Sequence, residues 1–264
     1  MLGAIIGDIA GSRFEMEKDN IKTKEFELFV PECSFTDDSL MTLAIAQSFI
    51  SCRGNFDILG SRAVLSMQWL GKLYPDCGFG GAFRKWIKSR YPKPYGSYGN
   101  GAAMRVSACG WVANTIDEAI AFSHMVTEVT HNHPQAMKGA EAVSVCIFLA
   151  RSGKTIQEIR DYINENYYEL NFTLDEIRDT YRFDVSCDGT VPYAIEAFLE
   201  STDFEDAIRN AVSIGGDSDT VAAIAGSIAE AYYGIPDVMR GLALHYLDQR
   251  LTNIVNDFES AYGK

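Results

Sequence analysis

Two short acidic segments are the clearest candidates for chemistry in this sequence. They are residues 35–39 (FTDDS) and residues 215–220 (GGDSDT). Each stands at the expected start of a helix, where Thr or Asp at the N-cap accepts backbone N–H bonds and acidic side chains suit the positive end of the helix dipole. Capping accounts for one or two carboxylates in a segment, and each segment holds a surplus. The surplus suggests that both helix starts contribute to one site.

Carboxylates gathered in one place raise one another's pKa unless cations compensate their charge. The two segments offer oxygen ligands without His or Cys, which favours Mg²⁺ or Mn²⁺, and Thr hydroxyls at the same turns could complete the coordination. Gly215 and Gly216 also allow positive φ and a close approach of backbone to ligand. Spacing alone does not decide between a binuclear metal site and two ordinary helix caps.

Residues 217–221 (DSDTV) also have the DxDxT form of aspartyl-phosphate phosphatases, in which the first Asp is a nucleophile. That motif normally follows an apolar strand near the N-terminus of an α/β domain. Here it follows a glycine pair late in a helical chain, and this context argues against a phosphatase.

A glycine-rich loop at residues 96–105 (GSYGNGAAMR) leads into a helix and could present backbone N–H groups to a phosphate, although a plain helix-entry turn fits equally well. The nearby Tyr91, Tyr95 and Tyr98 could stack on a base or simply pack the loop. In residues 130–134 (THNHP) the two His do not share a helix face and no third soft ligand is evident. Hydrogen-bonding or structural roles are therefore preferred to zinc binding.

The elements that must position these residues are helices. Apolar residues recur at helical spacing in five stretches, while strand-like alternation is nearly absent; the stretches are residues 39–50, 118–129, 136–150, 218–233 and 238–261. Stretch 218–233 has few charges, which predicts a central position. Loops are expected where Gly and Pro concentrate, at residues 74–81, 91–101 and 214–216. The chain is predicted to be all-α, as one compact domain over residues 1–264.

Composition excludes several classes of protein. The chain has 264 residues, 23 Lys plus Arg and 36 Asp plus Glu, for a net charge of −13, which disfavours non-specific nucleic-acid binding. The N-terminal apolar run lacks a basic region and is interrupted by Asp8, so no signal peptide is expected, and no apolar stretch is long enough for a membrane span. Six scattered cysteines without metal-ligand spacing indicate reduced thiols of a cytoplasmic protein, which we expect to be a monomer.

Taken together and in this order, the motifs resemble the ADP-ribosylglycohydrolase family, also called dinitrogenase-reductase-activating glycohydrolase-like. The matching segments are residues 3–15 (GAIIGDIAGSRFE), 35–39, 96–105, 130–134, and 215–220 running into 231–234 (AYYG). The resemblance implies an all-α, orthogonal helical fold with two divalent cations, usually Mg²⁺, at the base of a cleft that binds ADP-ribose.

The resemblance also implies roles for individual residues. The metal ligands would be Thr36, Asp37, Asp38, Asp217, Asp219 and Thr220. Glu15 falls where some members place a catalytic carboxylate, so that Glu15, Asp38 and Asp217 are the expected catalytic residues. The expected contacts to the ribose and diphosphate are Gly80, Ser97, Tyr98, Gly99, Asn100, Gly101 and His131, with Tyr98 a candidate for stacking on adenine.

The function implied is a Mg²⁺-dependent hydrolase that cleaves the bond at C1″ of ADP-ribose and releases it from a protein side chain or a small molecule. A non-catalytic relative that only binds ADP-ribose, or that serves packing like the lens crystallins resembling this family, is the alternative. Such a relative would be expected to lose metal ligands, whereas every acidic position of the two segments is filled. The leaving group stays open between arginine, serine, an acetyl ester, a nucleic-acid attachment and a small metabolite.

Overall fold

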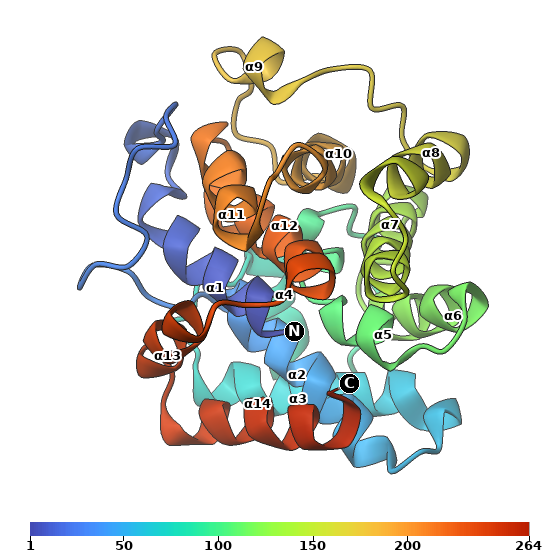
Figure 1. Ribbon diagram of the computed structural model, residues 1–264. Helices are drawn as coiled ribbons and strands as arrows, with labels where there is room; N and C mark the ends of the chain where they lie inside the picture. The colour runs from blue at the N-terminus through green and yellow to red at the C-terminus, as the bar shows by residue number, and fades with distance from the viewer. Residues whose placement is uncertain (264) are drawn as a thin grey trace.

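The computed structural model describes residues 1–263, which form helices joined by loops (Figure 1). The α-helices are α1 (Leu2–Gly11), α2 (Asp37–Cys52), α3 (Leu59–Leu73), α4 (Gly81–Lys88), α5 (Ser107–Val112), α6 (Ile116–Thr127), α7 (Pro134–Arg151), α8 (Ile156–Asn166), α9 (Leu174–Ile177), α10 (Cys187–Leu199), α11 (Phe204–Ser213), α12 (Ser218–Tyr233), α13 (Asp237–His245) and α14 (Gln249–Tyr262). Short 3₁₀ helices are η1 (Ser12–Phe14), η2 (Glu17–Asp19), η3 (Phe56–Ile58) and η4 (Asn100–Ala102). No strand occurs within residues 1–263, and the prediction of an all-α chain is confirmed.

Helix α12 lies at the centre of the structure. Its residues from Ser218 to Ala229 are all buried, and α1, α7, α10 and α11 pack around it (Figure 1). The predicted helix 218–233 and its central position are both confirmed. The buried start of this helix carries Asp217, Asp219 and Thr220 into the interior of the protein.

Helix α1 packs directly on α12 through a row of glycines. Gly3, Gly7 and Gly11 repeat at every fourth position, and a Cβ atom at Gly7 would stand 2.0 Å from the Ala222 carbonyl oxygen. A Cβ atom at Gly11 would stand 2.6 Å from Cα of Asp219. Because no side chain fits there, the two backbones touch, and this contact brings the last turns of α1 against the start of α12.

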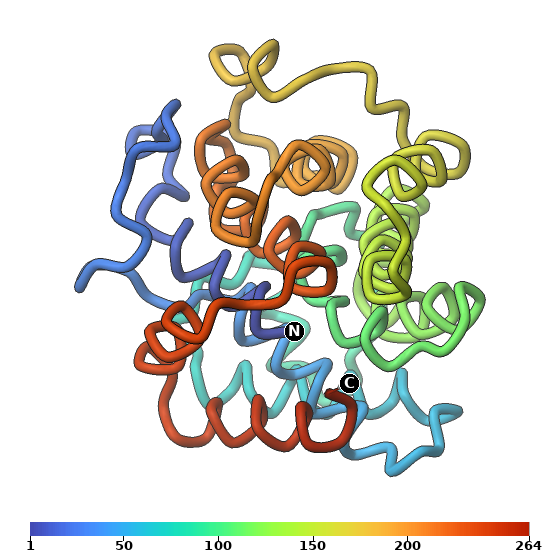
Figure 2. Tube along the Cα trace, viewed as in Figure 1, coloured from blue at the N-terminus to red at the C-terminus, as the bar shows by residue number. Residues whose placement is uncertain are grey.

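The segment between α1 and α2 arcs away from the helices and returns, as the tube trace shows (Figure 2). It carries Glu15 just after η1 and ends at Thr36, the N-cap of α2. Since α1 and α2 pack on each other, the return places the first acidic segment beside the end of α1.

One predicted helix boundary is wrong. The expected helix over residues 238–261 is two helices, α13 and α14, because the Asp248 carboxylate accepts a hydrogen bond from the backbone N–H of Leu251 at 3.0 Å and starts a new helix. Helical periodicity did not reveal the break, since apolar residues continue on both sides of it. No helix was predicted over Leu2–Gly11, which is buried on all sides and shows no amphipathic face.

The sequence predicted reduced cysteines and no membrane-spanning helix. All six cysteines are free thiols, and five of them are buried. Within residues 1–263, no helix combines the length and the hydropathy that crossing a bilayer requires.

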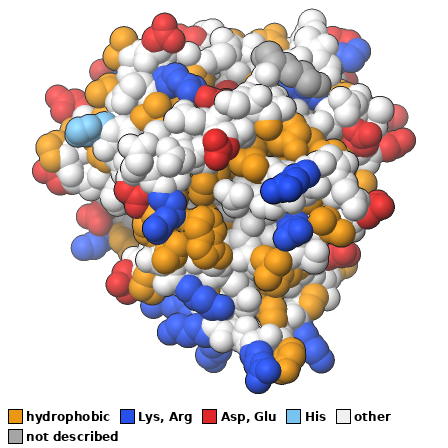
Figure 3. All heavy atoms as spheres, turned by 90° about the horizontal axis from the view of Figure 1, so that it is seen from below, with side chains coloured by type: hydrophobic (Ala, Val, Ile, Leu, Met, Phe, Trp, Pro, Cys, Tyr) orange, Lys and Arg blue, Asp and Glu red, His pale blue; other side chains and the backbone are white. Residues whose placement is uncertain are grey.

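Charge is distributed unevenly over the surface. Residues 77–116 contain six Lys or Arg, five of them exposed, and no Asp or Glu, although the whole chain has a net charge of −13. The face seen from below shows Lys and Arg gathered along its lower edge, next to patches of hydrophobic side chains (Figure 3).

Candidate metal centre and substrate cleft

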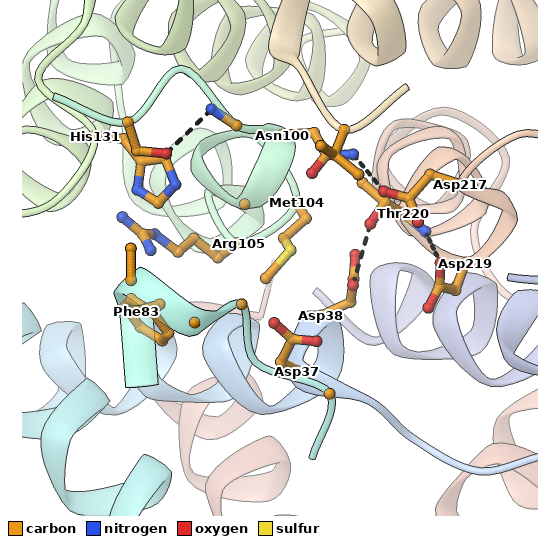
Figure 4. A pocket seen from close by; sticks show the side chains of 18 of the residues that line it. Asp37, Asp38, Phe83, Asn100, Met104, Arg105, His131, Asp217, Asp219 and Thr220 are labelled. Atoms are coloured by element: carbon orange, nitrogen blue, oxygen red, sulfur yellow. Dashed lines mark hydrogen bonds between the residues drawn. The ribbon is translucent and has the colours of Figure 1, made fainter. Parts of the chain in front are cut away.

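Carboxylates from four separate segments converge at one place in the interior, which we call the acidic floor. Its members are Asp8 from α1, Glu15 after η1, Asp37 and Asp38 from the start of α2, and Asp217 and Asp219 from the start of α12. Figure 4 shows the four residues from α2 and α12 around one space, with Asp38 and Thr220 joined by a hydrogen bond. The two acidic segments of the sequence therefore meet in space.

Helix capping explains only part of this arrangement. The Thr36 hydroxyl accepts a hydrogen bond from the backbone N–H of Asp38 at 3.3 Å and so caps α2. Asp217 occupies the N-cap position of α12, but its side chain forms no capping hydrogen bond. Asp217 follows a turn in which Gly215 and Gly216 have φ of 68° and 78°. The DxDxT motif of a phosphatase would instead follow a strand. Capping thus does not account for the Asp217 carboxylate.

Asp8 is the member of the floor that sequence reasoning missed. Its carboxylate is fully buried and accepts hydrogen bonds from the backbone N–H of Thr36 at 2.8 Å, the Thr36 hydroxyl at 2.7 Å and the backbone N–H of Ser39 at 3.0 Å. It therefore ties the end of α1 to the start of α2. In the sequence, Asp8 stands out only as the single carboxylate within the otherwise apolar, glycine-repeating residues 2–11, and this is the feature that could have identified it.

The carboxylates form two sets that could each hold an ion. Asp8, Asp38 and Asp219 offer oxygen atoms that all lie within 4.8 Å of one another, and Glu15, Asp217 and Asp219 form a second such set. Asp219 belongs to both sets. Two adjacent three-carboxylate sets with a shared member match the donor arrangement of a two-ion centre.

Burial and mutual repulsion raise the pKa values across the floor. Burial, followed by the charge of Asp8, raises the pKa of Asp37 to about 7. The pKa values of Asp38 and Asp219 lie well above the ordinary value, first through burial and then through neighbouring carboxylates. The pKa of the half-buried Glu15 is raised by burial and by the charges of Asp217 and Asp8. No Lys or Arg within residues 1–263 forms an ion pair with any of these six groups.

The donor chemistry fits divalent cations. Oδ1 of Asp38 is buried and has no hydrogen-bond partner within residues 1–263. A buried carboxylate oxygen without a donor is costly unless a cation contacts it. With only oxygen ligands and several negative charges, the floor suits Mg²⁺ or Mn²⁺ better than a softer metal.

The remaining predicted ligands lie at the edge of this centre. The Thr220 hydroxyl donates to Oδ2 of Asp38 at 3.2 Å, and Thr220 lines the cleft. Asp37 also lines the cleft, with its carboxylate against Gly78, whose φ is +91°. The Thr36 hydroxyl donates to Asp8, and Thr36 is absent from the cleft lining.

Above the floor opens a cleft of about 350 Å³. Of the predicted substrate contacts, six line this cleft: Gly80, Ser97, Gly99, Asn100, Gly101 and His131. Asn100 is buried, and its side-chain amide donates to Oδ2 of Asp217 at 2.6 Å and to the Thr190 hydroxyl at 3.1 Å. Asn100 thus links the glycine-rich loop to the acidic floor.

Tyr98 and the two histidines take different positions. Tyr98 is 54% exposed, lies outside the cleft lining, and has its ring 5.5 Å from that of His133. His133 caps α7 by accepting a hydrogen bond from the backbone N–H of Gln135. His131 is buried, its Nδ1 lies 2.7 Å from the Thr130 hydroxyl, and burial holds its pKa well below the ordinary value. A neutral imidazole that faces the cleft suits hydrogen bonding to a ligand.

Two backbone N–H groups of the glycine-rich loop already donate hydrogen bonds within the protein. The N–H of Gly99 donates to the Ser97 hydroxyl at 3.2 Å, and that of Asn100 donates to the Val185 carbonyl at 2.7 Å. These two groups are therefore not free to bind an anion, which at these two positions favours a helix-entry turn over a phosphate-binding loop. The loop is instead held against residues 183–186, from which Phe183 and Val185 also line the cleft.

The cleft contains one buried cation, Arg105, which sequence reasoning noted only as the end of the loop. Its side chain is 1% exposed and donates from Nη2 to the Thr130 hydroxyl at 2.7 Å and to the Val126 carbonyl at 3.3 Å. Nε has no partner, and no carboxylate within residues 1–263 pairs with the guanidinium. A buried arginine without a counter-charge in a cleft wall can attract an anionic ligand.

The chain is similar to known ADP-ribosylhydrolases. ADP-ribosylhydrolase ARH3 from Homo sapiens is 24% identical to the chain, over 90% of this chain and 85% of that protein. The ADP-ribosyl-[dinitrogen reductase] glycohydrolase from Rhodospirillum rubrum is 26% identical over 91% of this chain and 86% of its own. ADP-ribosylarginine hydrolase Tri1 from Pseudomonas putida is 27% identical over 89% of this chain and 70% of its own.

A solved structure described as an ADP-ribosylglycohydrolase-related protein complex has the same fold, with a TM-score of 0.67 and 23% identity over 97% of this chain and 93% of that chain. The sequence model of the ADP-ribosylglycohydrolase family matches residues 1–263. The chain therefore belongs to the ADP-ribosylglycohydrolase family and is an enzyme of the glycohydrolase class.

Proposed function

We propose that this protein is a metal-dependent hydrolase that cleaves the bond at C1″ of ADP-ribose and releases ADP-ribose from a modified side chain or a small molecule. The observation that carries the proposal is the acidic floor, where two three-carboxylate sets share Asp219 at the base of a cleft. The family and the names of the relatives support the substrate class.

Two divalent cations, Mg²⁺ or Mn²⁺, are proposed to be held by Thr36, Asp37, Asp38, Asp217, Asp219 and Thr220, with Asp8 added from the structure. When bound, such ions lower the pKa of water and offset the repulsion among the carboxylates. The chain supplies the geometry: Asp8 fixes the start of α2, and the Asn100 amide fixes the Asp217 carboxylate.

Glu15 is proposed as the general base that takes the proton of the attacking water. It is half-buried, and its pKa is raised by burial and by neighbouring negative charge, which makes its carboxylate a stronger proton acceptor. As the leaving group departs, C1″ gains positive charge, which the carboxylates of Asp38 and Asp217 are proposed to stabilise.

The other end of the cleft is proposed to bind the ADP moiety. Arg105 supplies positive charge for the diphosphate, His131 and Ser97 supply hydrogen bonds, and Gly80, Gly99 and Gly101 let the ligand approach the backbone. Tyr98 stands exposed beside Ser97 and Gly99, at the lip of the cleft, where an adenine ring could stack on it.

The test is to strip the protein of metal, add Mg²⁺, and measure free ADP-ribose released from ADP-ribosyl-arginine, an ADP-ribosyl-serine peptide and O-acetyl-ADP-ribose. Release from at least one substrate, abolished by chelator and by Asp38→Asn with the helical circular dichroism intact, is expected. Binding of ADP-ribose without release from any substrate would overturn the hydrolase and favour a binding module.

A further inference from the structure

Five exposed cations lie on the segment that joins two parts of the cleft lining, and we call them the basic rim. Its members are Arg84, Lys85, Lys88, Arg90 and Lys93, all exposed and none in an ion pair within residues 1–263. The segment that carries them begins and ends in the cleft lining, because Gly81 to Phe83 precede it and Tyr95 follows it.

The basic rim is held firmly in place. The Trp86 indole N–H donates to the Val129 carbonyl at 3.1 Å, and the backbone N–H of Tyr95 donates to the Thr130 carbonyl at 3.1 Å. The Gly96 N–H donates to Oδ1 of Asn132 at 2.8 Å. Both ends are thus fixed to the segment after α6, and the cations project from a rigid support.

An apolar stripe lies on the neighbouring helix α3. Leu65, Trp69 and Leu73 repeat at every fourth residue and are 58%, 44% and 43% exposed. Helix α3 packs on α4, where the Gln68 side-chain amide donates to the carbonyls of Trp86 and Ser89 at 3.1 Å and 2.8 Å. Figure 3 shows hydrophobic patches and clustered Lys and Arg on one face of the molecule.

Resting on the proposed function, we infer that the α3 stripe and the basic rim together dock the protein that carries the ADP-ribose, through a segment in which acidic residues flank apolar ones. The ADP-ribose enters the cleft while the acidic side chains of the carrier meet the rim and its apolar side chains meet Trp69. The preferred substrate class is thus an ADP-ribosylated acidic protein segment rather than a free small molecule.

The composition of this surface favours a protein over a nucleic acid. Phosphates would engage the rim and a base could stack on Trp69, but Leu65 and Leu73 would stay in water, since base stacking uses aromatic side chains. Protein interfaces combine apolar and aromatic residues with Arg at their centre and hold charged residues at their edge. The apolar stripe on α3 with the charged basic rim beside it matches this arrangement of protein interfaces.

The experiment compares two peptides that carry ADP-ribose on the same side chain, one flanked by Glu and Leu and one flanked by Lys and Leu. We expect kcat/KM to be about tenfold higher for the acidic peptide at low salt, and the preference to shrink as NaCl is added. Lys85→Gln with Lys88→Gln should remove most of the preference, and Trp69→Ser should lower kcat/KM for the acidic peptide by about tenfold.

Matched controls separate docking from catalysis and folding. Lys18→Gln with Lys154→Gln removes two exposed lysines elsewhere, and Val238→Ser removes a side chain that is 75% exposed on α13; both should keep the parental preference. Turnover of O-acetyl-ADP-ribose should stay unchanged in every variant.

Equal turnover of both peptides, or turnover of O-acetyl-ADP-ribose alone, would overturn the docking inference and leave the proposed function standing. A higher kcat/KM for an ADP-ribosylated single-stranded oligonucleotide than for the acidic peptide would replace the protein carrier with a nucleic acid. If no substrate is turned over, the proposed function fails, and fluorescence anisotropy of the same labelled peptides still decides whether the acidic one binds through these residues.

Discussion

The acidic floor and the basic rim are both clusters of like charges beside one cleft, and they differ in burial. Asp38 and Asp219 in the floor are almost fully buried, and their pKa values are raised well above the ordinary value. Lys85 and Lys88 in the rim are exposed, where water solvates each charge. A buried cluster of one sign is stable only when protons or bound cations neutralise it, whereas water solvates an exposed one. The floor therefore suits the proposed cations, whereas the rim is open to a partner.

Removing one carboxylate from the floor should give the largest effect. Asp38→Asn is expected to lower kcat by about a thousandfold or more, because a cation ligand is lost. In the metal-free protein the same variant should raise Tm, because it removes a buried like charge. Activity assays measure kcat, and thermal melts with and without Mg²⁺ measure Tm. A lower Tm in the metal-free variant would contradict the view that the floor is destabilised without cations. Lys85→Gln on the rim is the control that should change neither Tm nor the kcat for O-acetyl-ADP-ribose.

The glycine contact beneath the floor gives the next largest effect. Gly7→Ala would place a methyl group 2.0 Å from the Ala222 carbonyl oxygen, so that α1 must move away from α12. We expect about 3 kcal/mol of lost stability in urea unfolding and weaker metal binding, because Asp8 moves with α1.

Gly241→Ala in α13 is the matched control, since a Cβ atom there has no neighbour within 4 Å. It should leave stability unchanged or raise it slightly, as Ala favours helix over Gly. Equal effects of the two substitutions would show that the close α1–α12 contact is not required.

Two exposed tyrosines, Tyr98 and Tyr91, test where the adenine of the substrate binds. Tyr98→Ala should raise KM about tenfold with little change in kcat, because a stacking surface for adenine is lost. Tyr91 is 73% exposed on the basic rim, and Tyr91→Ala should leave KM for O-acetyl-ADP-ribose unchanged. An unchanged KM in the Tyr98 variant would remove Tyr98 from the proposed adenine site.

A charge pair outside both regions gives the smallest effect. The pKa of His124 is raised because its ring hydrogen-bonds the Glu141 carboxylate, with Nε2 and Oε2 2.6 Å apart. A raised folded-state pKa means that this pair stabilises the protein below pH 6.5 and that the contribution is lost as the pH rises through the raised value. The pair is partly exposed, so we expect less than about 1 kcal/mol, seen as a smaller pH dependence of Tm in His124→Gln. A pH profile identical to that of the parent would contradict this assignment.

The sequence predicted the fold class and the stretches that form α2, α6, α7, α12, α13 and α14, because amphipathic periodicity reports which face of a helix is buried. It failed for α1, which is buried on all sides and therefore shows no periodicity, and for the break at Asp248, which depends on a single side chain. Because α1 was not predicted, Asp8 was not identified as a site residue. Asp8 lies in the floor because the glycine contact packs α1 against α12, which no residue next to Asp8 in the sequence indicates. Local sequence thus indicated the two acidic helix starts, while the third element of the floor required the three-dimensional packing.

The substrate side was less predictable for a similar reason. The glycine-rich loop was identified, but its N–H groups at Gly99 and Asn100 are bonded to Ser97 and to Val185, which is distant in sequence. Arg105 stood at the end of the same motif, yet its lack of a counter-charge depends on which residues surround it in the fold. Hydrogen-bond satisfaction and charge compensation are properties of the assembled structure.

The most direct test of the central claim, that the buried carboxylates hold divalent cations, is calorimetric titration of Mg²⁺ or Mn²⁺ into the metal-stripped protein. We expect saturable binding of two ions per chain that is lost or reduced to one ion in Asp219→Asn, because Asp219 belongs to both carboxylate sets. No saturable binding, or binding of the same stoichiometry and affinity in Asp219→Asn, would contradict it.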